Sequence, residues 1–316
     1  MATLLIIGGT GFFGKSILDA FYRDLLKPWN VTHVIVMARN VDRLVNEASQ
    51  LISQNVTLLS ADITTTDALP YADFVIHAAA STDARNYISQ PESQRKNIQA
   101  GTYNYCRLAK KFHLESKIVY ISSGAVYGVQ SPTVDKLDEL SLPSNLSDMA
   151  IVKQNYAKAK QDAENAITQM GLLGLNVSIA RCFAFVGCWL PRDQHFAIGN
   201  FIDDVLNNRA IVVKATHEVY RSYMYADDLV EWLMTIADHA SVDCPIYNVG
   251  SDQAILLGDL AMELSKHFQV PAEVQLVSGT MIDRYVPSIK KAKDELGLFL
   301  KFDLFNSIQE AIKKIN

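Results

Sequence analysis

The 316-residue sequence has few of the features that mark membrane or secreted proteins. No apolar run approaches the roughly 20 residues that span a bilayer. The first residues, Met1-Ala2-Thr3 followed by Leu4–Ile7, include neither the basic region nor the cleavage site of a signal peptide. Cysteine is scarce and no two cysteines form a C-x-x-C pair, so we expect reduced thiols and no metal site. The four are Cys106, Cys182, Cys188 and Cys244.

Basic charge in excess is also missing, since 29 Lys and Arg face 34 Asp and Glu, a net charge of -5. This balance argues against a nucleic-acid-binding protein and leaves phosphate binding to a few placed groups. Hydrophobic residues make up 49% and charged residues 20%, as in ordinary globular proteins. We therefore expect a cytoplasmic protein that does not associate with membranes, built as one large domain or two smaller ones.

Short apolar runs alternate with helix-like stretches through the first half of the chain. Strands are predicted at Leu4–Ile7, His33–Met37, Val56–Ser60, Phe74–Ala78, Lys117–Ser122 and Asn176–Cys182. Helices are predicted at Lys15–Leu26, Val41–Ser53, Gln94–Phe112 and Ile151–Met170. Buried strands that alternate with helices indicate an α/β fold with a doubly wound parallel sheet.

After Phe183 the alternation loosens. The segment from Phe183 to Tyr220 is predicted to be rich in loops, with one helix at Ile198–Leu206. A helix at Asp227–Asp238, a strand at Ile246–Val249 and an irregular tail follow. We expect a nucleotide-binding domain from residues 1–182 and 221–250, and a smaller cap from 183–220 and 251–316.

A glycine-rich turn directly follows the first strand. Its sequence is Gly8-Gly9-Thr10-Gly11-Phe12-Phe13-Gly14, and a helix is predicted after it. At this spacing Gly8 permits the tight turn, Gly11 lets the backbone approach a diphosphate, and Gly14 lets helix and strand pack closely. The turn therefore predicts a dinucleotide whose diphosphate rests on a helix N-terminus.

With this turn the chain resembles the extended short-chain dehydrogenase/reductases, the NAD-dependent epimerase/dehydratase family. The resemblance implies a Rossmann sheet with a smaller α/β substrate cap. It also implies an NAD(P) cofactor bound by Gly8, Thr10, Gly11, Phe12, Phe13 and Gly14. By the same resemblance, the cofactor lies against Asp62, Ile63, Ala78, Ala79 and Ala80, Asn97 supports the backbone, and His77 is structural.

The second strand ends without the acidic residue that NAD-binding members carry there. It ends Met37-Ala38-Arg39-Asn40, and Arg43 follows. A guanidinium suits a 2′-phosphate through its planar fork, so NADP is favoured and NAD is the alternative. The other interpretation is that Arg39 and Arg43 are solvated surface charges.

A Y-x-x-x-K pair places Tyr156 and Lys160 on one face of a helix, 33 residues after Ser123. A carbonyl that accepts hydride needs a proton donor and a hydroxyl to hold its oxygen, which Tyr156 and Ser123 supply. Lowering the phenol pKa by about 3 units needs about 4 kcal/mol. One cation at about 4 Å supplies that much, so we expect Lys160 to lower the Tyr156 pKa. The resemblance adds that Lys160 binds the nicotinamide ribose.

The later segments indicate which reaction to expect. By resemblance Arg221 contacts a nucleotide diphosphate, and Ser123, Asn200 and Arg284 are the further substrate-binding candidates. Ala184 and Val186 replace an Asn and a Tyr of the family pattern R-x-F-N-x-Y-G. Dehydratase members carry Asp-Glu where this chain has Gly124-Ala125, so 4,6-dehydration is not expected.

Three functions follow from the resemblance. The first is NADPH-dependent reduction of the 4-keto group of a nucleotide-diphospho-6-deoxyhexose, as in polysaccharide biosynthesis. The second is a nucleotide-sugar 4-epimerase with tightly bound NAD(P), and the third is a non-catalytic NADP sensor or scaffold. A homodimer that pairs the helices Gln94–Phe112 and Ile151–Met170 is also implied.

Overall fold

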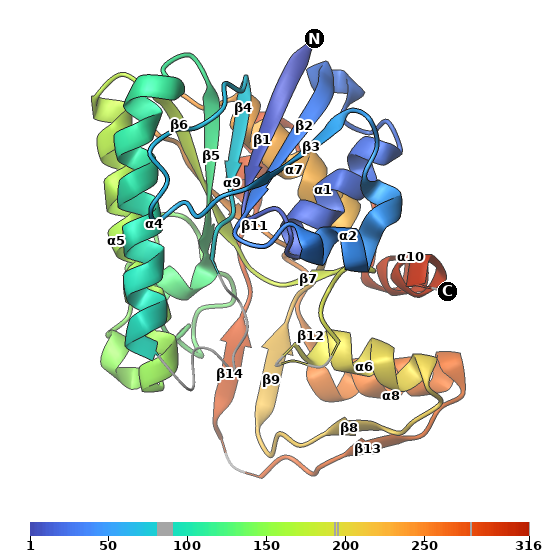
Figure 1. Cartoon of the computed structure of the whole chain (residues 1–316). Helices are drawn as coiled ribbons and strands as arrows, with labels where there is room; N and C mark the ends of the chain where they lie inside the picture. Colours follow the sequence, from blue (N-terminus) through green and yellow to red (C-terminus); the bar gives the residue numbers. More distant parts are fainter. Residues whose placement is uncertain (81–90, 193, 195, 279, 316) are drawn as a thin grey trace.

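Seven parallel strands form the central sheet of the structure, a computed structural model that describes residues 1–80, 91–192, 194, 196–278 and 280–315 (Figure 1). The strand order is β11-β6-β5-β4-β1-β2-β3, with every neighbouring pair parallel. The strands are β1 (Ala2–Ile7), β2 (Val31–Ala38), β3 (Val56–Ser60), β4 (Phe74–His77), β5 (Lys117–Ser123), β6 (Asn176–Cys182) and β11 (Ile246–Val249). The predicted doubly wound parallel sheet is confirmed.

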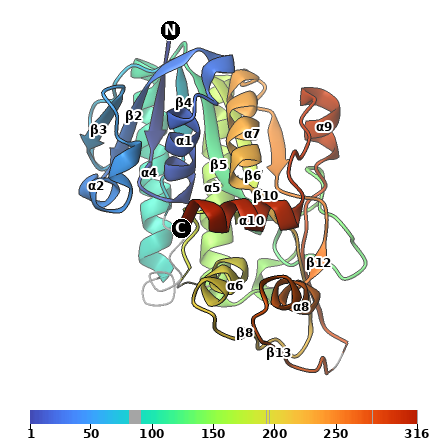
Figure 2. The same cartoon turned by 90° about the vertical axis from the view of Figure 1, so that its right-hand side faces the viewer.

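Helices cover both faces of this sheet, which explains why its central strands are apolar without alternation. One face carries α4 (Pro91–Phe112) and α5 (Ile151–Leu172), which pack side by side (Figure 1). The other face carries α1 (Phe12–Tyr22), α2 (Asp42–Ala48) and α7 (Ala226–Asp238) (Figures 1 and 2). The predicted helices and strands of the first half are confirmed, with ends that shift by a few residues.

A smaller group of elements lies beyond the carboxyl ends of the strands. It contains α6 (Ala197–Leu206), α8 (Leu257–Phe268), α10 (Leu304–Ile315) and three small sheets (Figure 1). The sheets pair β7 (Phe185–Val186) with β10 (Met224–Tyr225), β8 (Ile211–Val213) with β13 (Ala272–Val274), and β9 (Glu218–Arg221) with β12 (Ile255–Leu256) and β14 (Ile282–Tyr285).

The prediction of an irregular tail after Val249 is wrong. Helices α8, α9 (Lys290–Leu296) and α10 occupy much of it. In α8 the buried residues Leu260, Ala261 and Leu264 recur at helical spacing and pack into the core of the smaller module. This periodicity was present in the sequence, but short strands and turns on either side obscured it.

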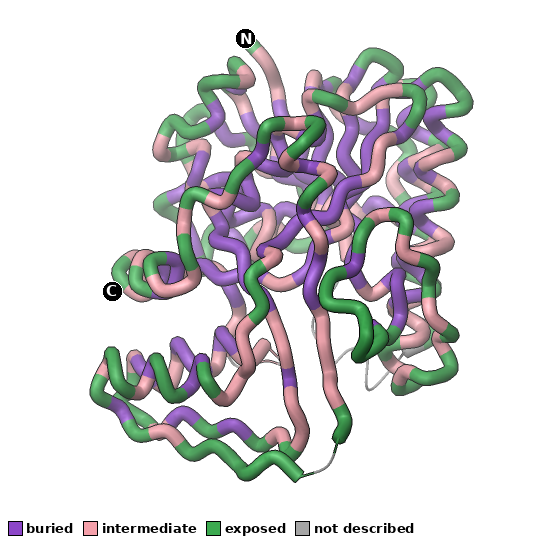
Figure 3. Tube along the Cα trace, turned by 180° about the vertical axis from the view of Figure 1, so that it is seen from behind, coloured by how far each residue is buried: buried purple, intermediate pink, exposed green. Residues whose placement is uncertain are grey.

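Buried residues concentrate along the central strands and the inner faces of the helices (Figure 3). The core beneath α1 and α7 also includes Ile289, Ala292 and Leu298, which the predicted division of the chain assigns to the cap. The exact domain boundaries stay a prediction. Among the helices that the structure describes, none is long and apolar enough to cross a membrane.

Candidate active site

The glycine turn joins β1 to α1 at the carboxyl edge of the sheet. Gly8 has a φ of +87°, and a Cβ there would lie 2.7 Å from the Ala79 Cα atom. A Cβ on Gly14 would lie 2.0 Å from the Gly9 carbonyl oxygen. A Cβ on Gly11, by contrast, would meet nothing nearer than the Gly8 carbonyl oxygen at 3.9 Å. Two glycines therefore serve packing, whereas Gly11 faces open space as a backbone does where a diphosphate approaches it.

The other predicted residues of the turn flank this opening. Gly11 is the N-cap of α1, and no side chain caps the first turn of this helix. The first backbone amides of α1 are therefore left to bind another group. Phe12 and Phe13 pack edge to face at 5.6 Å and both contact the ring of Phe185. Thr10, within the turn, is half-buried. The chain's own groups thus fit a cofactor diphosphate.

The two arginines beyond β2 differ in what surrounds them. Both are exposed, and the Arg43 guanidinium donates to Glu47 at 2.8 Å. The Glu47 carboxylate also binds the buried ammonium of Lys15, and these two cations hold the pKa of Glu47 below its usual range against the opposing effect of burial. Among the described residues no side chain binds the Arg39 guanidinium, and the Arg39 backbone carbonyl accepts a hydrogen bond from the Ser60 hydroxyl at 3.3 Å. Arg39 is therefore the better placed of the two for a cofactor phosphate.

The remaining predicted cofactor residues lie at the same edge of the sheet. Asp62 accepts hydrogen bonds from the amide and hydroxyl of Thr64, both at 2.9 Å, which fixes the turn after β3. Ile63 is buried, and the segment Ala78–Ala80 continues β4 beside Gly8. Asn97 is exposed on α4. Their contacts with a cofactor stay predictions.

Ser123, Tyr156 and Lys160 come together where β5 ends against α5. Ser123 is the last residue of β5, and its hydroxyl lies within hydrogen-bonding range of the Tyr156 phenol. Lys160 is 3% exposed and donates to the Ile121 carbonyl at 2.7 Å and to the Tyr120 hydroxyl at 3.3 Å. The Lys160 ammonium lies 6.0 Å from the centre of the Tyr156 ring. The structure thus assembles the predicted catalytic residues.

The Lys160 charge acts on the Tyr156 pKa in the expected direction, but the expectation that it brings this pKa below its usual value is wrong for this structure. Burial raises the pKa of Tyr156 and outweighs the opposing effects of the Lys160 charge and the Ser123 hydrogen bond. Burial likewise lowers the pKa of Lys160, with Tyr156 opposing. The sequence supplied the charge pair but not the desolvation, which depends on everything packed around the phenol. The Tyr156 phenol therefore stays protonated at neutral pH.

His77, at the end of β4, is buried among aromatic rings. Its ring lies 4.8 Å from that of Tyr105 and 5.3 Å from that of Tyr120. Neither ring nitrogen has a hydrogen-bond partner within the described part of the chain, and burial lowers the His77 pKa to about 3. These surroundings agree with the structural role expected for this histidine.

Glu164 and Arg181 form a buried ion pair that sequence reasoning missed. One guanidinium nitrogen of Arg181 lies 2.8 Å from the Glu164 carboxylate, and the side chains are 14% and 9% exposed. The carboxylate also accepts from Ser122, the neighbour of Ser123. Glu164 lies one helical turn after Lys160 on α5 and binds Ser122 on β5. The ion pair therefore ties α5, which carries Lys160, to β5, which carries Ser123. The i, i+4 spacing was visible in the sequence, but its partner on β6 was not.

The predicted substrate-binding residues are spread over the smaller module. Arg221, at the end of β9, donates to the Asp283 carboxylate at 2.7 Å. Arg284 stacks on the Tyr220 ring, with its guanidinium carbon 4.5 Å from the ring centre, and lies 3.5 Å from Asp135. Since side chains alternate along a strand, Arg221 and Arg284 belong to opposite faces of this small sheet. The structure does not bring them together.

The Asn200 side chain binds the backbone of a neighbouring loop, which does not mark it as a substrate-binding residue. Its side-chain amide donates to the Gln194 carbonyl at 2.8 Å. Two residues that sequence reasoning did not select, Phe183 and Tyr285, lie instead against Gly124, the residue after Ser123. Tyr285 is the neighbour of the predicted Arg284, and alternation along the strand was the signal that could have separated them.

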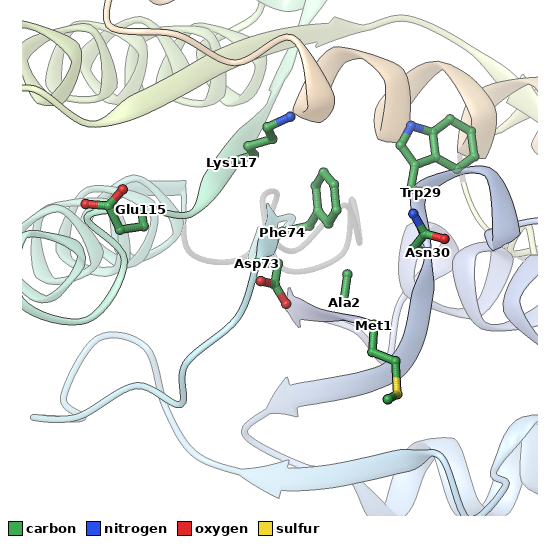
Figure 4. A pocket seen from close by; sticks show the side chains of 8 residues that line it. All are labelled: Met1, Ala2, Trp29, Asn30, Asp73, Phe74, Glu115 and Lys117. Atoms are coloured by element: carbon green, nitrogen blue, oxygen red, sulfur yellow. The ribbon is translucent and has the colours of Figure 1, made fainter.

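One pocket lies far from these residues. It has a volume of about 330 Å³ and is lined where strands begin, by residues that include Ala2, Asp73 and Lys117 (Figure 4). Ligands of doubly wound sheets bind at the opposite edge, so this pocket is not part of the candidate site. No group of His, Cys, Asp and Glu that could hold a metal ion occurs within the described ranges.

Comparison with known proteins agrees with this geometry. Residues 4–250 match the sequence model of the NAD dependent epimerase/dehydratase family. The chain belongs to this family. It is therefore an enzyme of an NAD-dependent family, which argues against the sensor or scaffold interpretation.

Individual relatives are distant. The chain is 26% identical to UDP-glucuronic acid decarboxylase 6 of Arabidopsis thaliana, over 93% of this chain and 83% of that one. It is also 26% identical to dTDP-D-glucose 4,6-dehydratase of Dictyostelium discoideum, over 83% of this chain and 61% of that one. Its fold is similar to UDP-glucose 4-epimerase of Thermotoga maritima, with a TM-score of 0.79, 18% identity and coverage of 98% and 97%.

Proposed function

We propose that the chain transfers hydride between a nicotinamide cofactor and C4 of a nucleotide-linked hexose. In the direction we propose, NADPH reduces a 4-keto-6-deoxyhexose. The observation that carries the proposal is the convergence of Ser123, Tyr156 and Lys160 at the carboxyl end of β5, the same edge of the sheet as the glycine turn. The relatives named as decarboxylases, dehydratases and epimerases of nucleotide sugars support the substrate class.

Each residue has a stated part in this chemistry. A bound NAD(P) supplies or accepts the hydride. Tyr156 donates its phenolic proton to the C4 oxygen, and Ser123 holds that oxygen by a hydrogen bond. The buried Lys160 ammonium stabilises the phenolate that forms when Tyr156 gives up its proton, because burial strengthens the attraction between the two charges. Arg221 attracts the sugar-nucleotide diphosphate.

Elimination of water from the sugar is not part of the proposal. A side chain at position 124 would meet the Phe183 ring and the Tyr285 hydroxyl, both at 2.7 Å from its Cβ. The position that, by the family resemblance, holds an acid in the dehydratases therefore has no room for one here.

A second function, 4-epimerisation with a tightly held cofactor, has one observation in its favour. Glu47 pairs with Arg43 and Lys15, which leaves Arg39 as the cation for a 2′-phosphate. A weaker preference for NADP suits an enzyme that retains NAD and recycles it.

The test mixes purified protein with a panel of nucleotide sugars, in one series with NADPH for the 4-keto sugars and in a parallel series with NAD⁺ or NADP⁺ for the sugars that carry a C4 hydroxyl. The panel holds dTDP-, CDP- and UDP-4-keto-6-deoxyhexoses, UDP-glucose, UDP-galactose and UDP-glucuronate. Stoichiometric loss of NADPH absorbance identifies a reductase, and sugar interconversion without net loss identifies an epimerase. Release of CO₂ from UDP-glucuronate, or no reaction with any sugar, contradicts both.

Tyr156→Phe should lower turnover at least 100-fold, the smaller effect expected for loss of a general acid, while NADPH still binds. Tyr71→Phe is the control, since Tyr71 is exposed and bonds Asp73 at the far edge of the sheet. Turnover by Tyr156→Phe at the wild-type rate refutes the mechanism.

We further propose a homodimer through α4 and α5, which sedimentation as a monomer at micromolar concentration would exclude.

A further inference from the structure

The small sheet of the cap delivers one tyrosine to the catalytic serine. Tyr285 is the last residue of β14 and pairs in register with Arg221 of β9. Its ring packs on that of Phe183, with centroids 4.7 Å apart. The Tyr285 hydroxyl lies beside Ser123, because a Cβ on the adjoining Gly124 would come within 2.7 Å of it. Hydrogen bonding to Ser123 lowers the pKa of Tyr285, as it does that of Tyr156, against the larger effect of burial. Ser123 thus joins a tyrosine of the nucleotide-binding sheet to a tyrosine of the cap.

The position of Tyr285 is held on both sides. Just after it, the Val286 amide donates to the buried side chain of Gln130 at 2.9 Å, and the Val286 carbonyl accepts from Leu137 at 2.9 Å. Just before it, Asp283 binds the Arg221 guanidinium. A side chain anchored in this way keeps its hydroxyl at one place, which is what a binding site for a rigid ring requires.

The space next to the hydroxyl is reserved by glycine. A Cβ on Gly124 would come within 2.7 Å of the Tyr285 hydroxyl oxygen. Position 124 therefore stays without a side chain as long as Tyr285 occupies the site. Burial raises the Tyr285 pKa, so its hydroxyl keeps its proton at neutral pH and acts as a hydrogen-bond donor rather than a base.

We propose that Tyr285 is a substrate-binding residue whose hydroxyl donates a hydrogen bond to the sugar oxygen next to the reacting one. Two hydroxyls bonded to one serine oxygen lie about 4 to 5 Å apart, so Tyr156 and Tyr285 can bind two neighbouring oxygens of one hexose. When the sugar binds, the hydroxyls of Tyr156 and Tyr285 donate to its two oxygens instead of to Ser123. The inference rests on the proposed function, since that function places the reacting oxygen at Ser123 and Tyr156.

The same strands link this contact to binding of the diphosphate. Arg221 and Tyr285 are register partners, and Asp283 joins their strands. A diphosphate that takes hold of Arg221 therefore acts on the strand that carries Tyr285. One small sheet of the cap therefore carries both the residue that binds the diphosphate, Arg221, and the residue that binds the sugar, Tyr285.

The test measures kcat and KM of Tyr285→Phe on whichever panel sugar the wild type converts. The control is Tyr220→Phe, which removes a hydroxyl that bonds Glu218 two residues earlier on the same strand, β9. A neutral hydrogen bond contributes about 1 to 1.5 kcal/mol, so kcat/KM of Tyr285→Phe should fall about tenfold, mainly through KM. The control should match the wild type, and the unfolding midpoints of all three should agree.

Deoxy substrates separate contact from structure. For a 4-keto-6-deoxyhexose the neighbouring oxygen is O3, so on the 3-deoxy analogue wild type and Tyr285→Phe should have equal kcat/KM, because the oxygen that Tyr285 binds is gone. For a panel sugar that carries a 6-hydroxyl, the same equality is expected on either the 3-deoxy or the 6-deoxy analogue. An unchanged kcat/KM on the parent sugar, or the same tenfold loss on every such analogue, overturns the inference while the proposed function stands. A wild type that converts no sugar of the panel overturns the proposed function itself, and the inference with it.

Discussion

Two glycines of the turn between β1 and α1, Gly14 and Gly11, should fail in different ways when each is replaced by alanine. In Gly14→Ala the new Cβ lies 2.0 Å from the Gly9 carbonyl oxygen and 2.4 Å from the Gly9 Cα. Both are backbone atoms of a tight turn, so β1 and α1 must move apart. Overpacking of this kind costs about 1 to 3 kcal/mol, and we expect the upper end because no flexible side chain can yield.

In Gly11→Ala the new Cβ meets nothing within 3.9 Å, and the backbone φ of -88° suits alanine. The unfolding free energy should stay within about 0.5 kcal/mol of the wild type. The methyl group instead occupies the side from which a diphosphate approaches the turn. The cofactor should bind at least about tenfold more weakly, which corresponds to about 1.4 kcal/mol.

The assay has two arms on the same three proteins. Urea unfolding without cofactor measures stability, and fluorescence titration with NADPH and NADH measures affinity. Each variant is the control for the other, since Gly14→Ala should mainly lose stability and Gly11→Ala mainly affinity. Wild-type affinity in Gly11→Ala would refute the assignment of the diphosphate to this turn. Wild-type stability in Gly14→Ala would refute the packing argument.

Three further predictions concern charge. Arg39→Ala should lower the preference for NADPH over NADH about tenfold, and Arg43→Ala should lower it less because Glu47 already binds that guanidinium; equal affinities in Arg39→Ala and wild type would contradict NADP binding at Arg39. Glu164→Gln should lower the unfolding free energy by about 3 kcal/mol, because Arg181 then loses its buried partner, whereas Asp294→Asn in an exposed pair should lower it by less than about 1 kcal/mol; similar losses in urea unfolding would contradict this. His77 has a pKa of about 3 when folded and 6.5 as a free group, so the stability it supports is complete above pH 6.5 and is lost as the pH falls toward 3. Going from about pH 7.5 to 5.5 should therefore cost the wild type about 1.4 kcal/mol more than His77→Phe, and parallel pH profiles would show that the histidine titrates when folded.

The parts of the fold that local patterns encode were predictable. The apolar strands β1, β4 and β6 and the helices α4 and α5 lie where periodicity placed them, because burial on both faces leaves a continuous apolar run. The glycine turn and the Tyr156–Lys160 pair could be predicted equally well, since each depends only on the spacing of residues a few positions apart in the sequence. The tail after Val249 was not, because its short helices and strands become stable only against one another.

The sequence by itself determined a parallel α/β sheet, a dinucleotide turn and a Ser-Tyr-Lys set, because each depends on residues close together in the chain or on strand ends that share one edge. The tertiary structure decided the rest. It showed that desolvation outweighs Lys160 at the Tyr156 phenol, because burial is a sum over all neighbours. It also brought Tyr285 to Ser123 from 162 residues away and left Arg284 on the other face of its strand. No local pattern encodes contacts of that range, because they follow from how the cap closes over the sheet.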